Sequence, residues 1–182
     1  RAWYFCAQHV YPGAATPTGG HVIGLCEPLV QPDTKVAVDV IGVGSSPFDW
    51  GSASGMRVIA MNGSERTEAR SKQGQLGFFN RKSEWHWRLR EGLDPNSGED
   101  LAIPDDPELF EELTSIKWEP TTRGIRVGDK DDVKELLGRS PDKAESLIYA
   151  YGVVTTAGSG VFDYMRELAA ANGSAQTVAK AA

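Results

Sequence analysis

The sequence has only two cysteines, Cys6 and Cys26, so a framework of disulfide bonds is excluded. Neither cysteine has a further cysteine or a histidine at the spacing of a zinc finger. No segment approaches the roughly 20 apolar residues that a membrane-spanning helix needs. The first residues also lack a starting methionine and the basic and then apolar order of a secretion signal. We therefore expect one domain, with or without a tail, from the middle of a longer protein in a reducing compartment.

Two common catalytic motifs are missing as well. The phosphate-binding loop Gly-x-x-x-x-Gly-Lys-Ser/Thr does not occur, which excludes ATP hydrolysis by that route. The histidines His9, His21 and His86 are scattered, and no serine or cysteine nucleophile is arranged beside them. His86 lies between two tryptophans, where packing or a place on the surface is a better explanation than catalysis.

The charge is unevenly distributed along the chain, although its formal net value of −6 argues against a general nucleic-acid coat. Residues 57–90 contain eight basic and three acidic side chains, whereas residues 91–119 contain ten acids and only Lys117 as a base. The first segment could form a local positive surface that attracts phosphate. On charge alone, two solvated faces of surface elements explain the pattern better.

Strand-like and helix-like segments alternate along the chain, which indicates an α/β fold with a sheet of mixed direction. The expected strands are residues 2–11, 35–41, 56–61, 101–104, 114–119 and 123–128. The expected helices are residues 20–30, a short one after 42–47, 78–93, one that opens at Asp106-Pro107, 131–137 and 140–151. We expect Phe78, Trp85 and Leu89 to face the core from one helix, and Leu109, Phe110 and Leu113 from the next. Residues 62–77 are expected to form a mobile loop.

Asp39 is the first candidate for chemistry. It lies in the β-branched run 35–41, which is continuous enough to predict a central strand buried on both faces. Burying a lone carboxylate is costly unless it is paired, hydrogen-bonded or bound to a metal. Asp39 also precedes a glycine-rich turn, at the strand end where open α/β sheets place their sites. A carboxylate that caps the next helix or binds loop amides explains the position equally well.

A second pair of carboxylates lies at the start of the expected helix 140–151. Ser140 suits the N-cap and Pro141 the first helical position, so Asp142 and Glu145 share one face and could converge on a metal. Acids in the first turn are also ordinary complements of the helix dipole, which is the better explanation without further context. The acids of 129–132 are best explained as surface charges. Lys130 could approach a phosphate or a catalytic carboxylate, although exposure to solvent is the favoured interpretation.

Five segments in this order resemble the nuclease half of phage terminase large subunits. They are RAWYF with VYPG, VDVIGVG, GFFNRKSEWHWRLRE, LAIPDD and KDDVKELLGRSPD, and together they span about residues 1–151. The resemblance implies an RNase H-like mixed sheet flanked by helices, with acids that hold two ions of Mg²⁺ or Mn²⁺. Such a domain cuts concatemeric DNA by metal-dependent hydrolysis of phosphodiester bonds.

The resemblance assigns roles to three acids of this chain. Asp39 matches the second catalytic acid, and Asp142 matches the late acid. The family often continues with Asp-Ala after the late acid, where this chain has Glu145-Ser146, and Glu145 is an expected additional metal ligand. The family's first acid lies in an opening strand that has no counterpart here, so the fold is expected to lack its first strand. We therefore expect these 182 residues to bind metal poorly and to cut DNA weakly or not at all.

The resemblance also implies partners and a domain division. Double-stranded DNA is the expected substrate, and its backbone is assigned to Arg66, Arg70, Lys72, Arg81 and Lys82. The terminase small subunit, the portal, a ring of subunits and the cytoplasm of a bacterial host follow from the family, with no membrane partner. Residues 1–155 are expected to form the nuclease domain, and 156–182 a C-terminal helix with a flexible tail. Two alternatives are a non-catalytic scaffold domain of the packaging motor and another RNase H-like nuclease, of the resolvase or transposase type.

Overall fold

The structure, a computed structural model, describes residues 2–155, so the predicted C-terminal helix and tail at 156–182 lie outside it. The strands are β1 (Ala2–Tyr4), β2 (Lys35–Asp39), β3 (Arg57–Met61), β4 (Asp100–Ala102), β5 (Trp118–Thr121) and β6 (Gly124–Val127). The helices are α1 (Gly19–Cys26), α2 (Ser45–Ala53), α3 (Arg81–Leu93), α4 (Pro107–Ser115), α5 (Lys130–Leu137) and α6 (Asp142–Thr155). None of these helices is long and apolar enough to cross a membrane.

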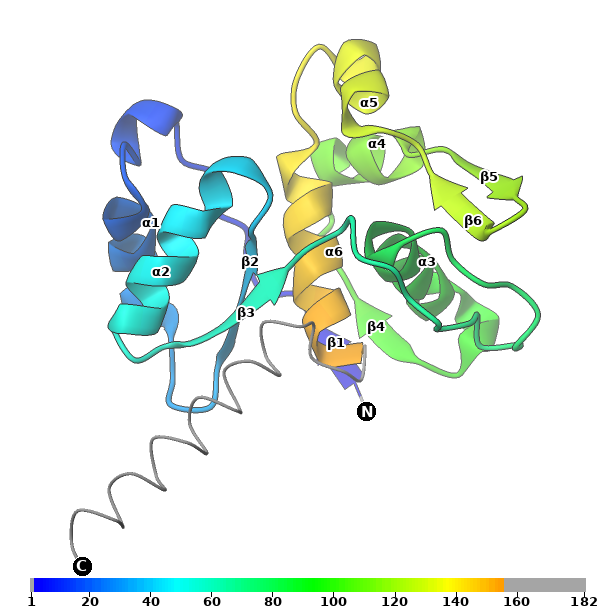
Figure 1. The fold of residues 1–182 in the computed structure, drawn as a ribbon, viewed down its shortest axis with the longest axis horizontal. Coiled ribbons are helices and arrows are strands. Elements are labelled where there is room, and N and C mark those ends of the chain that lie inside the picture. The colour runs from blue at the N-terminus through cyan, green and yellow to red at the C-terminus, as the bar shows by residue number, and fades with distance from the viewer. Residues whose placement is uncertain (1, 156–182) are drawn as a thin grey trace, which may run out of the picture.

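The described strands associate two by two. β1 pairs with β4 and β2 with β3, both in parallel, whereas β5 and β6 form an antiparallel hairpin. α6 runs through the middle of the molecule, with α1, α2, β2 and β3 on one side and α3, β5 and β6 on the other (Figure 1). Mixed strand directions with flanking helices confirm the predicted fold class. Hydrogen bonding does not join the three pairs into one continuous sheet within the described residues.

The main core surrounds α6. Its buried side chains include Trp85 and Leu89 of α3, Leu109 of α4, and Leu147 and Tyr151 of α6. Each large apolar side chain buried in this way contributes about 1.5–3 kcal/mol to stability. Strands β1 to β4 pack against the same helix, since each supplies a partly buried apolar side chain to this cluster. α6 is therefore the element that positions β2 and its acid relative to the rest of the molecule.

Three of the expected strands differ from the structure. The strand predicted for residues 114–119 is β5, which begins only at Trp118 because Thr114 and Ser115 still belong to α4. The strand predicted for residues 2–11 is only β1, because Phe5 makes the last backbone hydrogen bond to the β4 segment, at Ala102. β2 forms as predicted, but its residues are half-buried instead of buried on both faces. The reason is that β2 has β3 as a neighbour on one edge and no hydrogen-bonded strand on the other among residues 2–155.

The helices α3 and α4 differ from expectation in detail. α3 begins at Arg81 because the side chain of Asn80 caps it, so Phe78 lies before the helix and packs with Trp87 and Ile125 in a second cluster. In α4, Leu109 is buried as predicted, but the prediction that Phe110 faces the core is wrong, because its side chain is 68% exposed. The buried face continues instead at Glu112, three residues after Leu109.

His86 on α3 is partly buried. Its Nδ1 lies 2.7 Å from the carbonyl oxygen of Lys82, to which a neutral ring donates. The pKa of His86 is lowered to about 4. Burial is the largest cause, the nearby charge of Lys82 acts in the same direction, and the hydrogen bond to the Lys82 carbonyl opposes them. His86 is therefore neutral in the folded protein at pH 7.

This lowered pKa predicts a loss of stability in acid. Because the unfolded histidine takes up its proton near pH 6.5, the contribution of His86 is complete above pH 6.5 and is lost as the pH falls towards 4, by up to about 1.4 kcal/mol per pH unit. Urea unfolding between pH 7 and pH 4.5 should therefore show a steeper loss for the wild type than for His86→Gln. Identical pH dependence of the two proteins would show that His86 does not titrate in this way.

Candidate active site

Asp39 is the last residue of β2 and lies at the carboxyl end of the parallel pair, opposite Met61 of β3. Its Oδ1 accepts a hydrogen bond from the backbone N–H of Ile41 at 2.9 Å. The turn that follows passes so close to the strand that a Cβ on Gly44 would overlap the carbonyl oxygen of Asp39. One carboxylate oxygen of Asp39 therefore binds a loop amide, as one of the two interpretations of the sequence expected. The other oxygen has a different partner.

The second oxygen of Asp39 reaches α6. Tyr149 donates its hydroxyl to Asp39 Oδ2 at 3.2 Å, across 110 residues of sequence. Burial raises the pKa of Tyr149, and the negative charges of Asp39 and Glu145 raise it further, so the phenol keeps its proton as a donor. The sequence analysis missed Tyr149. Its signal was the helical spacing, because Asp142, Glu145 and Tyr149 lie three and then four residues apart on one face of α6.

Lys130, at the first position of α5, contacts both acids at the start of α6. Its Nζ lies 2.5 Å from Glu145 Oε2 and 3.5 Å from Asp142 Oδ1. Burial lowers the pKa of Lys130, but the hydrogen bond and charge of Glu145, together with Asp142, outweigh this and raise the pKa above its ordinary value. The lysine is therefore a permanent cation on these carboxylates. The favoured prediction, that Lys130 only faces solvent, is corrected by this contact.

The start of α6 is fixed by polar contacts. Ser140 donates its hydroxyl to Asp142 Oδ1 at 2.5 Å, so Ser140 binds the first-turn acid instead of capping the helix as predicted. The helix begins at Asp142, and Glu145 N–H donates to the carbonyl of Pro141. From α4, the buried carboxylate of Glu112 accepts the backbone N–H of Ala144 at 2.7 Å. These contacts determine where Asp142 and Glu145 present their oxygens.

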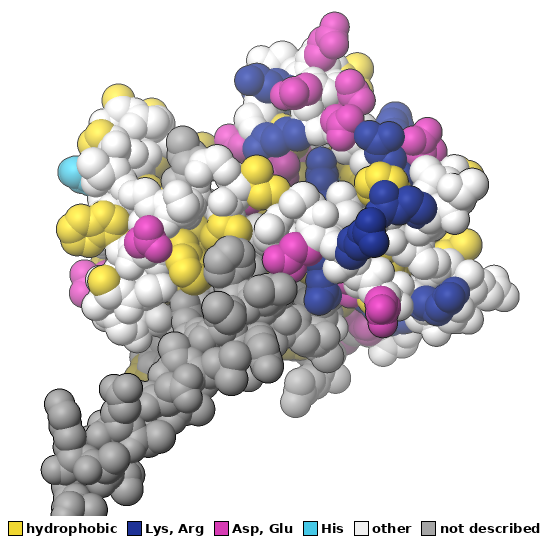
Figure 2. All heavy atoms as spheres, viewed as in Figure 1, with side chains coloured by type: hydrophobic (Ala, Val, Ile, Leu, Met, Phe, Trp, Pro, Cys, Tyr) yellow, Lys and Arg dark blue, Asp and Glu magenta, His cyan; other side chains and the backbone are white. Residues whose placement is uncertain are grey.

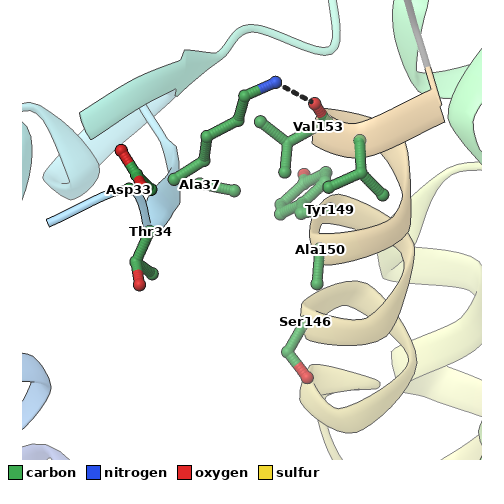
Figure 3. Close-up of a pocket in the computed structure, with 9 residues that line it drawn as sticks. Asp33, Thr34, Ala37, Ser146, Tyr149, Ala150 and Val153 are labelled. Carbon is green, nitrogen blue, oxygen red and sulfur yellow. Dashed lines mark hydrogen bonds between the residues drawn. The ribbon is translucent and has the colours of Figure 1, made fainter. Parts of the chain in front are cut away.

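A groove of about 620 Å³ runs between the start of β2 and the face of α6 that carries Tyr149 and Val153. Figure 3 shows Tyr149, Ala150 and Val153 on the helix side of the groove, and Ala37 and Thr34 on the strand side. Lys35 spans the groove near the end of the helix, where its Nζ donates to the carbonyl of Val153 at 3.4 Å. Tyr149 lines the groove while its hydroxyl binds Asp39, so this cavity borders the carboxylate at the end of β2.

The acids supply the right kind of donor for Mg²⁺ or Mn²⁺ but not the right number. Carboxylate oxygens are the ligands that these hard cations prefer. Asp39 meets Tyr149, whereas Asp142 and Glu145 meet Lys130, and no group of three acids, histidines or cysteines that could hold a metal occurs between residues 2 and 155. The described side chains therefore do not complete a two-metal centre on their own.

The five basic residues predicted to contact DNA lie at the start of α3 and along the segment that precedes it. Arg81 and Lys82 are at the start of α3, where the Nζ of Lys82 donates to the carbonyl of Gly128, two residues before Lys130. Lys72 forms an ion pair with Glu99, near the other end of α3. Arg66 and Arg70 are exposed between these places.

The segment between β3 and α3 is irregular, as predicted, but it is tied to α3 at several points. Thr67 donates to the buried carboxylate of Glu84, and the backbone N–H of Lys72 donates to Glu91. Arg88 donates to the carbonyl of Arg70. These bonds hold residues 62–77 along the length of the helix.

Comparison with known proteins identifies the fold. No protein-family model matches the sequence, and no curated protein matches it. Among solved structures, the chain is similar to the nuclease domain of the large terminase subunit gp2 of bacterial virus Sf6. The TM-score is 0.53 at 22% sequence identity, over 73% of this chain and 70% of the other. The chain therefore shares the α/β fold of that nuclease domain.

Proposed function

We propose that this chain is a DNA-cutting nuclease domain of the terminase type, which acts on double-stranded DNA during packaging of a viral genome. The observation that carries the proposal is the meeting of Asp39 with the Tyr149 face of α6. It sets Asp39, at the carboxyl end of a parallel strand pair, against the face of α6 on which Asp142 and Glu145 precede Tyr149. The fold shared with the Sf6 nuclease domain supports the same conclusion.

The proposed cofactor is Mg²⁺ or Mn²⁺, with Asp39, Asp142 and Glu145 as part of its ligand set. Because the described acids are divided between Tyr149 and Lys130, we expect weak binding, with no pair of tight sites. Lys130 also competes with any cation for Glu145. The further ligands that a tight centre requires must come from outside residues 2–155 or from the DNA.

A Mn²⁺ titration tests both parts of this expectation. The wild-type chain should show no stoichiometric binding of two ions at about 0.1 mM. Lys130→Gln removes the competing charge and should bind Mn²⁺ about two- to tenfold more tightly, as expected for one ion-pair interaction at a partly exposed site. Lys134→Gln, which removes an exposed charge from the same helix, is the control. Two tight sites in the wild type, or equal affinity in both variants, would contradict the proposed arrangement.

Cleavage itself is tested with supercoiled plasmid at millimolar Mn²⁺. We expect slow conversion to the nicked and linear forms, which stops when the metal is chelated. Because catalysis and folding are separate properties, the circular dichroism spectrum is recorded for the same sample. A well-folded chain that leaves the plasmid intact over many hours would favour the second candidate function, described next.

The second candidate is a non-catalytic scaffold domain of a packaging motor. The specific observation in its favour is the ion pair of Lys130 with Glu145, because a permanent cation on a proposed ligand satisfies that carboxylate without metal. The contact of Tyr149 with Asp39 favours the nuclease instead, since it keeps a carboxylate at the strand end. A nuclease of the resolvase or transposase type is a third possibility, and preference for branched over linear duplex in the cleavage assay would identify it.

The remaining parts of the proposal concern the surroundings of such a domain. They are contacts with a terminase small subunit and a portal, assembly in a ring of subunits, and action in the cytoplasm of a bacterial host. The resemblance to the terminase family supports all of them. Co-purification of the chain with a small subunit and a portal would test the partners directly.

A further inference from the structure

The β5–β6 hairpin carries two arginines that face the same aromatic ring. The guanidinium of Arg123 lies 4.2 Å from the centroid of Phe79, and that of Arg126 lies 5.5 Å from it. Phe79 directly precedes the capping residue of α3 and is only partly buried. A guanidinium that stacks on a ring keeps its N–H donors in its own plane, where they remain available to a phosphate.

The two arginines differ in their other partners. Arg126 also contacts the carboxylates of Glu119 and Asp129, at 3.8 and 3.4 Å. Arg123 is exposed and has no carboxylate within ion-pair distance in the described part of the chain. Phe79 thus holds a guanidinium at the hairpin turn whose charge is not neutralised by a described neighbour. This is the arrangement expected of a contact to an anion from outside.

Backbone bonds fix the hairpin to the region around the proposed site. Ile125 N–H donates to Gly77, and Phe79 N–H donates back to Ile125, at 2.9 and 2.8 Å. Further along β6, the backbone N–H of Val127 donates to the hydroxyl of Ser83 at 3.1 Å. Gly124 has a φ of +115° and passes so close to Gly77 that a side chain would not fit. The arginines therefore have a fixed position relative to the start of α3.

The hairpin is connected through residues 128–130 to the acids at the start of α6. After β6 the chain runs through Gly128, which Lys82 binds, to Lys130, whose amine lies on Glu145. Arg123 and Lys130 are seven positions apart, so their Cα atoms lie at most about 25 Å apart, or about seven base pairs of duplex DNA. Figure 2 shows that lysine and arginine side chains gather over the half of the molecule with α3, α5 and β6, whereas the half with α1 and α2 shows none in this view.

We propose that the β5–β6 hairpin is a DNA-contacting arm, in which Phe79 holds Arg123 against the backbone of the duplex that the proposed nuclease site cuts. This inference rests on the proposed nuclease function and extends its DNA surface to residues outside the basic segment 57–90. The contacts are to phosphates, so they carry no sequence preference.

Duplex binding in EDTA tests the proposal without requiring cleavage. The probe is a fluorescein-labelled 20-base-pair duplex, and its dissociation constant is measured by anisotropy at several NaCl concentrations. Arg123→Gln, which breaks no described ion pair, should weaken binding about tenfold and reduce the salt slope by about one. Arg57→Gln is the matched control, because Arg57 is exposed at the start of β3, the end opposite Asp39. It should bind like the wild type.

Variants of Phe79 test the role of the ring as a positioning residue. Phe79→Leu keeps an apolar side chain but removes the ring face, and should weaken binding about two- to fivefold, as expected for a cation–π contact. Phe79→Tyr keeps the ring and should restore wild-type affinity, a pattern that a general loss of stability would not produce. The thermal midpoint of each variant is recorded alongside.

Two outcomes would overturn the inference. If the wild type binds the duplex and nicks plasmid, but Arg123→Gln behaves like Arg57→Gln, the hairpin is not a DNA contact and the proposed nuclease function stands. If the wild type does not bind the duplex even at low salt, the hairpin proposal and the proposed function both fail.

Discussion

Asp39→Asn is expected to lower the rate of metal-dependent plasmid nicking by at least about 100-fold, as is usual when a charged catalytic side chain is neutralised. The exchange keeps the shape of the side chain and an oxygen that can accept the N–H of Ile41. It removes the negative charge at the end of β2, which is what the proposed cation requires. The amide nitrogen takes the place of Oδ2 and can donate to the hydroxyl oxygen of Tyr149, so the contact between β2 and α6 should survive with its direction reversed.

Asp49→Asn is the matched control for this experiment, because Asp49 is an exposed acid on the neighbouring helix α2. It removes the same charge and should leave the nicking rate within about twofold of wild type, as expected for a distant surface charge. Equal nicking by Asp39→Asn and the wild type would show that Asp39 takes no part in cleavage. Nicking that survives chelation of the metal would reveal a contaminating or metal-independent activity.

Glu112→Ala is expected to lower the free energy of unfolding by about 2–4 kcal/mol, because it leaves the buried N–H of Ala144 without its acceptor and removes the buried carboxylate that pairs with Arg139. The side chain of Glu112 is 1% exposed, accepts the N–H of Ala144 and binds Arg139. The expected decrease in thermal midpoint is about 5–10 °C for a chain of this size. The start of α6 should loosen first, so the affinity for Mn²⁺ should fall as well.

Glu111→Ala is the control, because it removes the same negative charge from Arg139 without disturbing a buried side chain. Glu111 binds the same guanidinium of Arg139 at 3.0 Å, but its side chain is 61% exposed. Its loss should cost only about 0–1 kcal/mol, as for other surface ion pairs. If Glu111→Ala and Glu112→Ala destabilise the chain equally, the buried bond to the start of α6 is not what stabilises this region.

The sequence predicts most of the local structure, because local patterns determine it. Asp106 followed by Pro107 predicted the start of α4, and the Asp106 side chain caps that helix in the structure. Gly138 ends α5 with a φ of +70°, as its place after the helix indicated. The same patterns placed Asp39 at a strand end and Asp142 at a helix start, but they did not connect the two.

The rest of the site depends on packing that no local pattern encodes. Tyr149 became part of the site because α6 lies against β2, and Lys130 because α5 turns back over the start of α6. The same holds in α4. Hydrophobicity alone predicts that Phe110 is buried and Glu112 exposed, whereas the structure has Phe110 exposed and Glu112 buried. Burial of Glu112 is favourable only because Arg139 and the start of α6 satisfy its carboxylate.

The central claim, that Asp39 and the start of α6 form one cation site, is tested most directly by Fe²⁺-directed cleavage of the polypeptide. Fe²⁺ bound in place of Mg²⁺ or Mn²⁺ generates hydroxyl radicals with ascorbate and peroxide, and mass spectrometry locates the backbone cuts. We predict cuts near residues 39–44 and near 142–149, suppressed by excess Mg²⁺ and by Asp39→Asn. Cuts confined to the acid-rich segments 105–112 or 129–132, or cuts that Asp39→Asn leaves unchanged, would contradict the claim.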